Sequence, residues 1–220
     1  MKRIVEITDD GSTTLFVPEM DEHYHSTKGA LVESRHIFIE MGLNYLHKEK
    51  INILEIGFGT GLNAWLTLLE AEKTKRNVTY TGIELYPLPW DLISELHYSD
   101  DPLFRAMHDA PWDNPCVMTP YFMLRKINKD FTAINFDNGT KFDVVYFDAF
   151  APEKQPEMWQ SSLFDQLHSV IAENGVLTTY CAKGNIRRML QNSGFEVERL
   201  PGPPGGKREI LRGKKIVNCK

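Results

Sequence analysis

Cysteine is scarce in this sequence, and the other markers of a secreted or membrane protein are also missing. The chain has three cysteines, Cys116, Cys181 and Cys219, which are odd in number and far apart. They form no C-x-x-C or Cys/His ligand spacing, so neither a disulfide framework nor a metal site is predicted. No apolar run approaches the roughly 20 residues that span a bilayer, and no apolar segment follows the basic N-terminus as it would in a secretory signal. We therefore expect a cytoplasmic protein without metal or membrane contacts.

An overall excess of positive charge is missing as well, since the net charge is −5. With 42% hydrophobic residues, the composition indicates a packed globular domain rather than a disordered chain. The charge is nevertheless uneven. Residues 181–220 contain ten of the 25 Lys and Arg residues and three of the 30 Asp and Glu residues. This asymmetry indicates either one basic face or a solvated tail.

Residues 51–63, I-N-I-L-E-I-G-F-G-T-G-L-N, contain the most informative motif. Apolar residues predict a strand over 51–56, three glycines make a turn, and a helix follows over 61–73. Such a turn places a ligand against exposed backbone N–H groups. The third glycine comes one residue earlier than in the dinucleotide fingerprint G-x-G-x-x-G, which disfavours a nicotinamide oxidoreductase. The pattern E-x-G-x-G-x-G resembles motif I of the S-adenosylmethionine-dependent methyltransferases; a tight turn without a ligand is the alternative.

Strands and helices are predicted to alternate along most of the chain. Residues 3–7 and 14–17 predict a hairpin, and residues 27–46 a helix. Sheet strands are predicted at 51–56, 78–84, 121–127, 142–147, 175–181, 195–200 and 208–212. Helices are predicted at 61–73, 157–172 and 184–193, and residues 87–107 are helical but broken by prolines. This order predicts an α/β fold, a mostly parallel seven-stranded sheet with helices on both faces. We expect residues 1–47, the hairpin and helix extension, to pack on a methyltransferase domain formed by residues 48–220.

Three acids follow strands of the predicted sheet, where ligands bind in such folds. Glu84 lies about 20 residues beyond the glycine turn and can accept hydrogen bonds from both ribose hydroxyls of an adenosine. Asp130 can accept from an adenine amino group, while the backbone N–H of Phe131 donates to the ring. Asp148 ends a strongly apolar strand, where a carboxylate is costly unless it is satisfied. Beside the flat ring of Phe150, it can hold an amine or a planar base against a methyl donor; a loop or helix-capping acid is the alternative.

From residue 20 onward the chain resembles the tRNA 5-aminomethyl-2-thiouridine methyltransferases, the methyltransferase half of the bifunctional wobble-uridine enzymes. The segments D-A-F-A-P and G-K-R-E are the most particular parts of this resemblance. The matching segments are residues 24–36, 54–63, 148–152, 156–159, 175–182, 187–188 and 206–209.

The resemblance implies a Rossmann-like class I methyltransferase that transfers a methyl group from S-adenosylmethionine to the primary amine of the modified uridine in tRNA. S-adenosylhomocysteine is the other product, and a chain ending at Lys220 is expected to lack the flavin oxidase domain of fused relatives. The implied catalytic residues are Asp148, Phe150 and Glu33. The implied cofactor-binding residues are Glu55, Gly57, Gly59, Gly61, Asn63, Glu84, Asp130, Phe131, Tyr24 and Ser26. Arg187, Arg188, Lys207 and Arg208 are expected to meet tRNA phosphates.

Other functions remain open from the residues alone. A methyltransferase for a small-molecule amine fits the same motifs, and a salt bridge to Arg35 or to a neighbouring helix is an alternative role for Glu33. An aminopropyltransferase shares the fold but needs a second acid just beyond Asp148, and residues 149–152 contain none. A non-catalytic RNA-binding relative would not need the glycine turn, Glu84 and Asp148 together.

Overall fold

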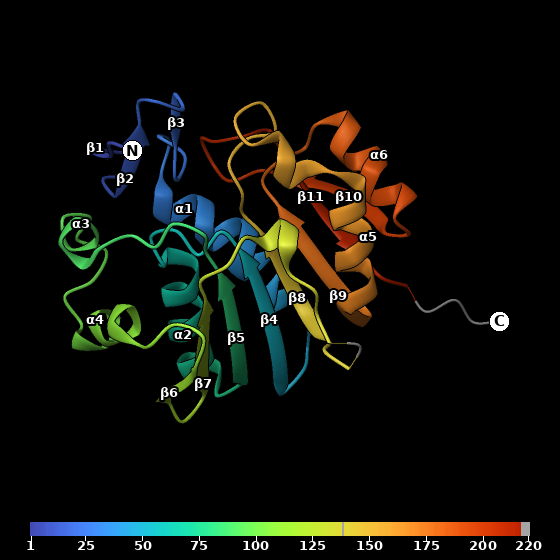
Figure 1. Cartoon of the computed structure of the whole chain (residues 1–220), viewed down its shortest axis with the longest axis horizontal. Helices are drawn as coiled ribbons and strands as arrows, with labels where there is room; N and C mark the ends of the chain where they lie inside the picture. The colour runs from blue at the N-terminus through green and yellow to red at the C-terminus, as the bar shows by residue number, and fades with distance from the viewer. Residues whose placement is uncertain (138, 217–220) are drawn as a thin grey trace.

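The computed structural model describes residues 1–137 and 139–216 of the chain. One large sheet forms the centre of the molecule, and helices pack around it (Figure 1). Cys219 and Lys220 lie outside the described residues. No helix within the described ranges is long and apolar enough to cross a membrane.

The central sheet has eight strands rather than the expected seven, in the order β10-β11-β9-β8-β4-β5-β7-β6. These are β4 (Lys50–Ile56), β5 (Asn77–Ile83), β6 (Pro115–Thr119), β7 (Phe122–Ile127), β8 (Phe142–Phe147), β9 (Ile171–Thr179), β10 (Glu196–Pro201) and β11 (Glu209–Lys214). The five strands from β9 to β7 run parallel, as the alternation of strands and helices predicts. The unexpected strand is β6, which pairs antiparallel with β7 at one edge. Its first residue is Pro115, which an edge strand tolerates but which weakens a strand pattern in the sequence.

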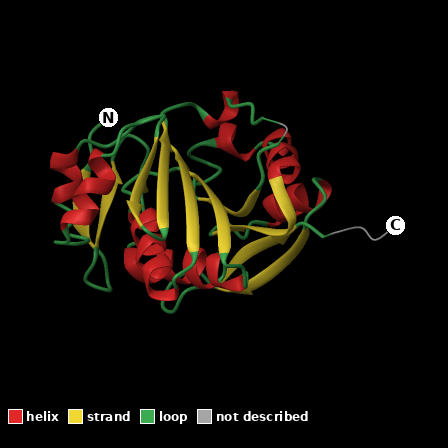
Figure 2. Ribbon diagram, turned by 90° about the horizontal axis from the view of Figure 1, so that it is seen from below, coloured by secondary structure: helices red, strands yellow, loops and turns green. Residues whose placement is uncertain are grey.

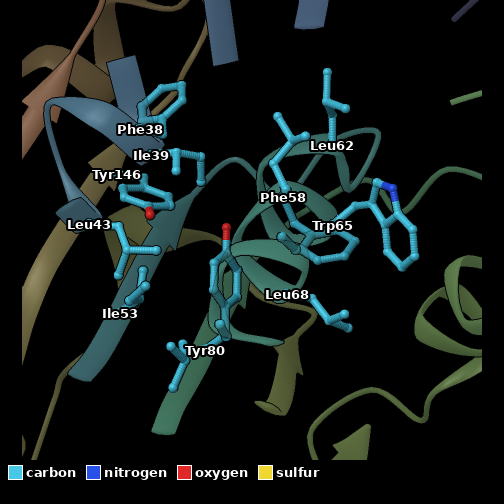
Figure 3. Packing of buried hydrophobic residues seen from close by; sticks show 14 of the residues in the cluster. Phe38, Ile39, Leu43, Ile53, Phe58, Leu62, Trp65, Leu68, Tyr80 and Tyr146 are labelled. Carbon is cyan, nitrogen blue, oxygen red and sulfur yellow. The ribbon is translucent and has the colours of Figure 1, made fainter. Parts of the chain in front are cut away.

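Side chains along the central strands alternate between two hydrophobic cores, one on each face of the sheet. Ile53 and Tyr146 belong to one core, while their neighbours Leu54 and Phe147 belong to the other. The first core also receives side chains from α2 (Leu62–Thr74), α3 (Trp90–Ser94), α4 (Pro102–Asp109) and η1 (Arg35–Glu40), as Figure 3 shows for part of it. The second receives side chains from α5 (Ser161–Val170) and α6 (Gly184–Asn192). Figure 2 shows the strands side by side, with helices packed around them.

The N-terminal segment forms a small sheet of its own, β1 (Ile4–Ile7), β2 (Thr13–Val17) and β3 (Glu22–His23). The predicted hairpin is confirmed as the antiparallel pair β1 and β2. The single helix expected over 27–46 is divided into α1 (Ala30–Ser34), the π-helical η1 and the 3-10 turn η2 (Leu43–Tyr45). Ile37, Phe38 and Ile39 in η1 are all buried, so protein encloses this segment on more than one side. A one-sided helical pattern does not describe such a segment.

Candidate active site

A cavity of about 520 Å³ opens at the carboxyl ends of the parallel strands. Its volume falls within the roughly 300–1,000 Å³ of small-molecule sites. One wall consists of the segments that follow β4, β5, β7 and β8, which is the edge of the sheet where the fold predicts a ligand. Residues 22–27 and Glu33 form another wall, so the N-terminal segment covers the strand ends.

The first amides of the glycine turn after β4 bond to the end of β5 and are not free for a ligand. The N–H groups of Gly57 and Phe58 both donate to the carbonyl of Ile83, at 3.0 Å. The expectation that exposed amides face the ligand is therefore wrong for these positions, because the end of β5 lies close enough to take them. Gly57 instead allows a close approach: its φ is +89°, and a Cβ there would lie 2.6 Å from the backbone oxygen of Asp148.

Glu84 is fixed at the cavity wall by two backbone donors. Its Oε2 accepts from the N–H of Gly59 at 2.9 Å, and its Oε1 accepts from the N–H of Tyr86 at 2.9 Å. Each carboxylate oxygen has a second lone pair, so both can still accept from hydroxyl groups of a ligand. The side chain is thus held in place by its two backbone contacts, and its predicted contact with a ribose diol stays a prediction.

Asp130 and Phe131 line the same cavity. They follow β7, the strand next to β5 in the sheet, whereas Glu84 follows β5 itself. Asp130 caps the short helix η3 (Phe131–Ala133), and its Oδ1 accepts from the N–H and hydroxyl of Thr132 at 2.9 and 2.8 Å. Phe131 is buried and belongs to the second core. The short helix therefore holds the predicted adenine-contacting pair in one rigid turn.

Asp148 lies where β8 ends, with its N–H bonded to the carbonyl of Ile56 on the neighbouring strand at 3.0 Å. Its Oδ2 accepts a hydrogen bond from Asn63 Nδ2 at 2.8 Å. Burial raises the pKa of Asp148 to about 7, and the negative charge of Glu33 adds to this; the Asn63 hydrogen bond and the Lys207 charge act in the opposite direction. A carboxyl that titrates near neutrality can both accept and release a proton under working conditions.

Two donors hold the loop that follows Asp148, and the sequence analysis assigned neither of them to the site. The hydroxyl of Tyr180 donates to the carbonyl of Ala149 at 2.9 Å, and Trp159 Nε1 donates to the carbonyl of Phe150 at 2.7 Å. The Phe150 ring meets the Tyr24 ring edge-on at 5.1 Å. The available signal was that Trp159 and Tyr180 both lie inside segments that carry the family resemblance.

Glu33 and Lys207 meet at the cavity from opposite ends of the chain. Glu33 Oε2 accepts from the N–H of Ser26 at 2.7 Å, and its Oε1 accepts from Lys207 Nζ at 3.4 Å. The Lys207 ammonium also lies 3.8 Å from the centre of the Tyr180 ring. Glu33 therefore has a salt bridge, but its partner comes from the loop before β11 and not from Arg35. Lys207, expected among the phosphate-binding residues, belongs to the cavity wall.

Glu55 and Gly61 do not line the cavity, and a direct cofactor contact is wrong for Glu55. Glu55 is fully buried, and its Oε1 accepts from Asn63 Nδ2 at 2.9 Å. Burial raises the pKa of Glu55 well above its ordinary value. His25 is also buried and bonded to Thr60 Oγ1 at 2.8 Å, and burial lowers its pKa to about 4. His25 is therefore neutral at physiological pH.

The basic C-terminal segment is less free to bind phosphate than its composition suggests. Five of its basic residues form ion pairs with acids in the structure. Three of these residues lie in β10 and β11, where acids and bases are neighbours, and Lys183 and Lys207 pair with acids of other segments. These pairs are Lys183–Glu153, Arg199–Glu209, Lys207–Glu33, Arg212–Glu198 and Lys214 with Glu196 and Glu198. Arg187 on α6 is half-buried, whereas Arg188 on α6 and Arg208 are exposed, and none of the three lines the cavity.

Comparison with known proteins agrees with this geometry. Residues 121–216 match the model of a family described as S-adenosyl-L-methionine-dependent methyltransferase. The structure of MNMC2 from Aquifex aeolicus is similar with a TM-score of 0.75 and 25% identity, over 96% of this chain and 70% of that one.

The chain belongs to a family of S-adenosyl-L-methionine-dependent methyltransferases. The "tRNA 5-methylaminomethyl-2-thiouridine biosynthesis bifunctional protein MnmC" of Pseudomonas fluorescens is 32% identical over 88% of this chain. The protein of the same name from Azoarcus sp. is 29% identical over 87%. The methyltransferase spans 32% of the length of each of these relatives. These matches, together with the observed order of strands and helices, show that it has a class I fold and that its cofactor is S-adenosylmethionine.

The residues of this methyltransferase fit that cofactor. The cavity offers the Glu84 carboxylate for a ribose diol and the Asp130–Phe131 turn for an adenine ring, both where the fold predicts them. The turn amides of Gly57 and Phe58 are already bonded, which suits a cofactor whose reactive centre is a cation and not a phosphate. The assignment of these individual contacts is our proposal.

Proposed function

We propose that this methyltransferase transfers a methyl group to the primary amine of 5-aminomethyluridine, with or without the 2-thio group, at the wobble position of tRNA. The observation that carries the proposal is the position of Asp148, a carboxyl titrating near neutrality in the wall of the cofactor cavity. The bifunctional relatives are named for the synthesis of the corresponding methylated nucleoside, which supports the same substrate class. Since the chain spans about a third of those relatives, the substrate remains a proposal.

The chemistry requires a neutral amine, because an ammonium has no lone pair for attack. An alkyl amine resembles lysine, with a pKa of about 10, and arrives protonated. The two carboxyl groups of Asp148 and Glu33 attract that cation. The ionised Asp148 carboxylate then takes one proton from it, which leaves the lone pair of the amine free for attack. When bound, S-adenosylmethionine supplies an electrophilic methyl group on a sulfonium that leaves readily. Asp148 and the Phe150 ring orient the amine toward it, and such positioning can contribute roughly 7–11 kcal/mol.

Replacement of Lys207 by glutamine is expected to move the acidic limb of the pH–rate profile to higher pH. The Lys207 charge favours the ionised form of Asp148, so its loss raises the pKa of that carboxyl further above about 7. At a given pH, more of the enzyme then holds Asp148 protonated and inactive as an acceptor. The measurement is kcat/KM as a function of pH. Lys154, another cavity lysine, pairs with Asp21, and its glutamine variant is the control; equal midpoints for all three proteins contradict the assignment.

The tRNA surface that we propose lies on α6 and on the loop before β11. Arg188 and Arg208 are exposed there, and α6 begins next to Lys183, whose partner Glu153 lies in the loop after Asp148. This places the start of α6 beside the loop that carries Asp148. Phosphates that flank an inserted nucleoside could therefore contact these arginines, which position the nucleic acid without reading its sequence. Arg187 is more enclosed and would contribute from the same helix.

Charge reversal of both Arg188 and Arg208 to glutamate is expected to weaken tRNA binding and to flatten its salt dependence. Each phosphate contact that is lost reduces the slope of log affinity against log salt by about one. Filter-binding titrations over a series of salt concentrations provide the measurement. Lys73→Glu, at the distant end of α2, reverses one charge instead of two and should bind as the wild type does. If the double variant retains the wild-type slope, this surface does not contact tRNA.

The test of the function itself is incubation of the protein and labelled S-adenosylmethionine with tRNA from cells that lack the modification, followed by identification of the labelled nucleoside. Label in 5-methylaminomethyluridine, with or without sulfur, is the expected result. Label only in a polyamine or another small amine would support the small-molecule alternative. An aminopropyltransferase would transfer no methyl group, and a non-catalytic relative would leave the tRNA unlabelled.

We also propose that two parts of the chain have different roles. Residues 48–220 would form the methyltransferase domain, and residues 1–47 would serve as an extension that completes its site. Tyr24, Ser26 and Glu33 support this proposal, because all three line the cavity from the N-terminal side.

A further inference from the structure

One amide group connects the fully buried Glu55 to Asp148 at the cavity wall. Asn63 Nδ2 donates to Asp148 Oδ2 at 2.8 Å and to Glu55 Oε1 at 2.9 Å. An amide nitrogen has two hydrogens, so these two bonds use both of them. Asn63 is 3% exposed and Glu55 is fully buried, so water does not compete for the contact between them, whereas Asp148 also faces the cavity. The Asp148 carboxyl is thus attached to a chain of buried groups and not only to the backbone of its loop.

The orientation of the Asn63 amide follows from its two neighbours. With the amide turned over, its oxygen would face two carboxyl oxygens, which is repulsive unless both carboxyl groups carry a proton. In the observed orientation the amide satisfies an oxygen of each group whether the group is ionised or neutral. The base of the side chain is also held, because Asn63 is the second residue of α2 and Thr67 Oγ1 donates to its carbonyl at 2.7 Å.

Glu55 takes part as a neutral acceptor. Burial raises the pKa of Glu55 well above its ordinary value and so favours its neutral form; the hydrogen bond from Asn63 acts against this shift, and the charge of Asp148 adds to it. A neutral carboxyl still accepts through its carbonyl oxygen, which is what the Asn63 contact needs. A charged Glu55 would oppose the ionisation of Asp148 through repulsion between like charges.

We propose that Asn63 is a positioning residue for methyl transfer: its amide, held by the buried Glu55, keeps the Asp148 carboxyl in one orientation at the cavity. This inference rests on the proposed role of Asp148 as the group that accepts from the substrate amine. Asn63 itself, expected from the sequence to bind the cofactor, then acts on the reaction through Asp148. The hydrogen bond also favours the ionised form of Asp148. The same contact therefore fixes the orientation of the carboxyl group and increases the fraction of it that is ionised.

The test is a titration of Asp148 that requires no substrate. Carboxyl-carbon NMR of aspartate-labelled protein follows the group, and the signal that disappears in Asp148→Asn identifies it. The wild type is expected to titrate near pH 7. In Asn63→Ala, and in Asn63→Ser should the alanine variant fold poorly, the midpoint is expected to rise because the ionised form loses a donor. Glu55→Gln keeps an oxygen acceptor and should keep the wild-type midpoint.

Thr81→Val is the control, since it removes a buried hydroxyl from β5 at a position that does not line the cavity. Its midpoint should equal that of the wild type. Turnover of the Asn63 variants is measured alongside, and kcat is expected to fall about 100-fold, the loss typical of a reacting group displaced by about 1 Å. An unchanged Asp148 midpoint in both Asn63 variants overturns the proposal. A midpoint in Glu55→Gln that moves as far as in Asn63→Ala overturns the neutral role of Glu55. If the wild type leaves tRNA unlabelled, the proposed substrate fails while the titration still decides the role of Asn63.

Discussion

Asp148→Ala is expected to reduce kcat by about 10²–10⁴-fold, the range usual for a general acid or base. The side chain lies in the cavity wall and has a pKa of about 7. The alanine variant therefore lacks the group that accepts the amine proton. Affinity for S-adenosylmethionine should change little, because the ribose and adenine contacts that we propose belong to other strand ends. Single-turnover rates measure the chemical step, and calorimetry measures cofactor binding in the same preparations.

The pKa of Asp148 also predicts how the rate of methyl transfer changes with pH. The folded-state pKa of Asp148 is raised to about 7, so the carboxyl is protonated below that pH and ionised above it. The wild-type rate should therefore rise with pH through about 7 and then level off. Asp148→Asn keeps the size of the side chain and cannot titrate, so its residual rate should lack this limb. An alanine variant with wild-type turnover, or an acidic limb that survives in the asparagine variant, would falsify the role of Asp148.

The second large effect is expected for Glu84→Ala, which should weaken S-adenosylmethionine binding by about 10²–10⁴-fold. The carboxylate has one free lone pair on each oxygen, and hydrogen bonds to a charged acceptor are worth about 1.5–3 kcal/mol each. Two such bonds to a ribose diol give roughly 3–6 kcal/mol, which corresponds to that range of Kd. Calorimetric titration of the cofactor is the direct measurement.

Two controls separate binding from folding in the Glu84 experiment. The alanine variant also leaves the N–H groups of Gly59 and Tyr86 without their acceptor, so the unfolding temperature is recorded alongside. Glu95→Ala removes the same charge from an exposed position at the end of α3 and should bind the cofactor normally. A Glu84 variant that folds well and binds with wild-type affinity would remove this residue from the ribose site.

Local patterns were sufficient for much of the fold. The β-branched run before the glycine turn and the apolar run before Asp148 predict β4 and β8, because strands covered on both faces have few polar residues. The rule that ligands bind at the carboxyl ends of parallel strands then brings Glu84, Asp130 and Asp148 to one cavity. The strand β6 and the division of the helix at 27–46 could not be read in the same way. In both places the contacts made by the folded chain outweigh the local periodicity.

The site shows the same limit at the level of single residues. Lys207 and Glu33 are 174 positions apart in the sequence, and the folded chain alone decides that they pair. Glu55 belongs to the glycine motif, yet its side chain points into the core, because alternate residues of a strand face opposite sides. The charge count of the C-terminal segment suggested a basic face, whereas the pairing of β10 with β11 neutralises several of its residues.

The amino-acid sequence by itself determined the order of strands and helices, the glycine turn and the acids at the strand ends, since these depend on residues close together in the chain. Tertiary structure alone decided that Asn63 joins Asp148 to Glu55, and that Tyr180 and Trp159 hold the loop after Asp148. Each of these contacts joins a side chain of one element to a group in another. They depend on how the strands pair and on which face each side chain takes, and neither can be read from a local pattern.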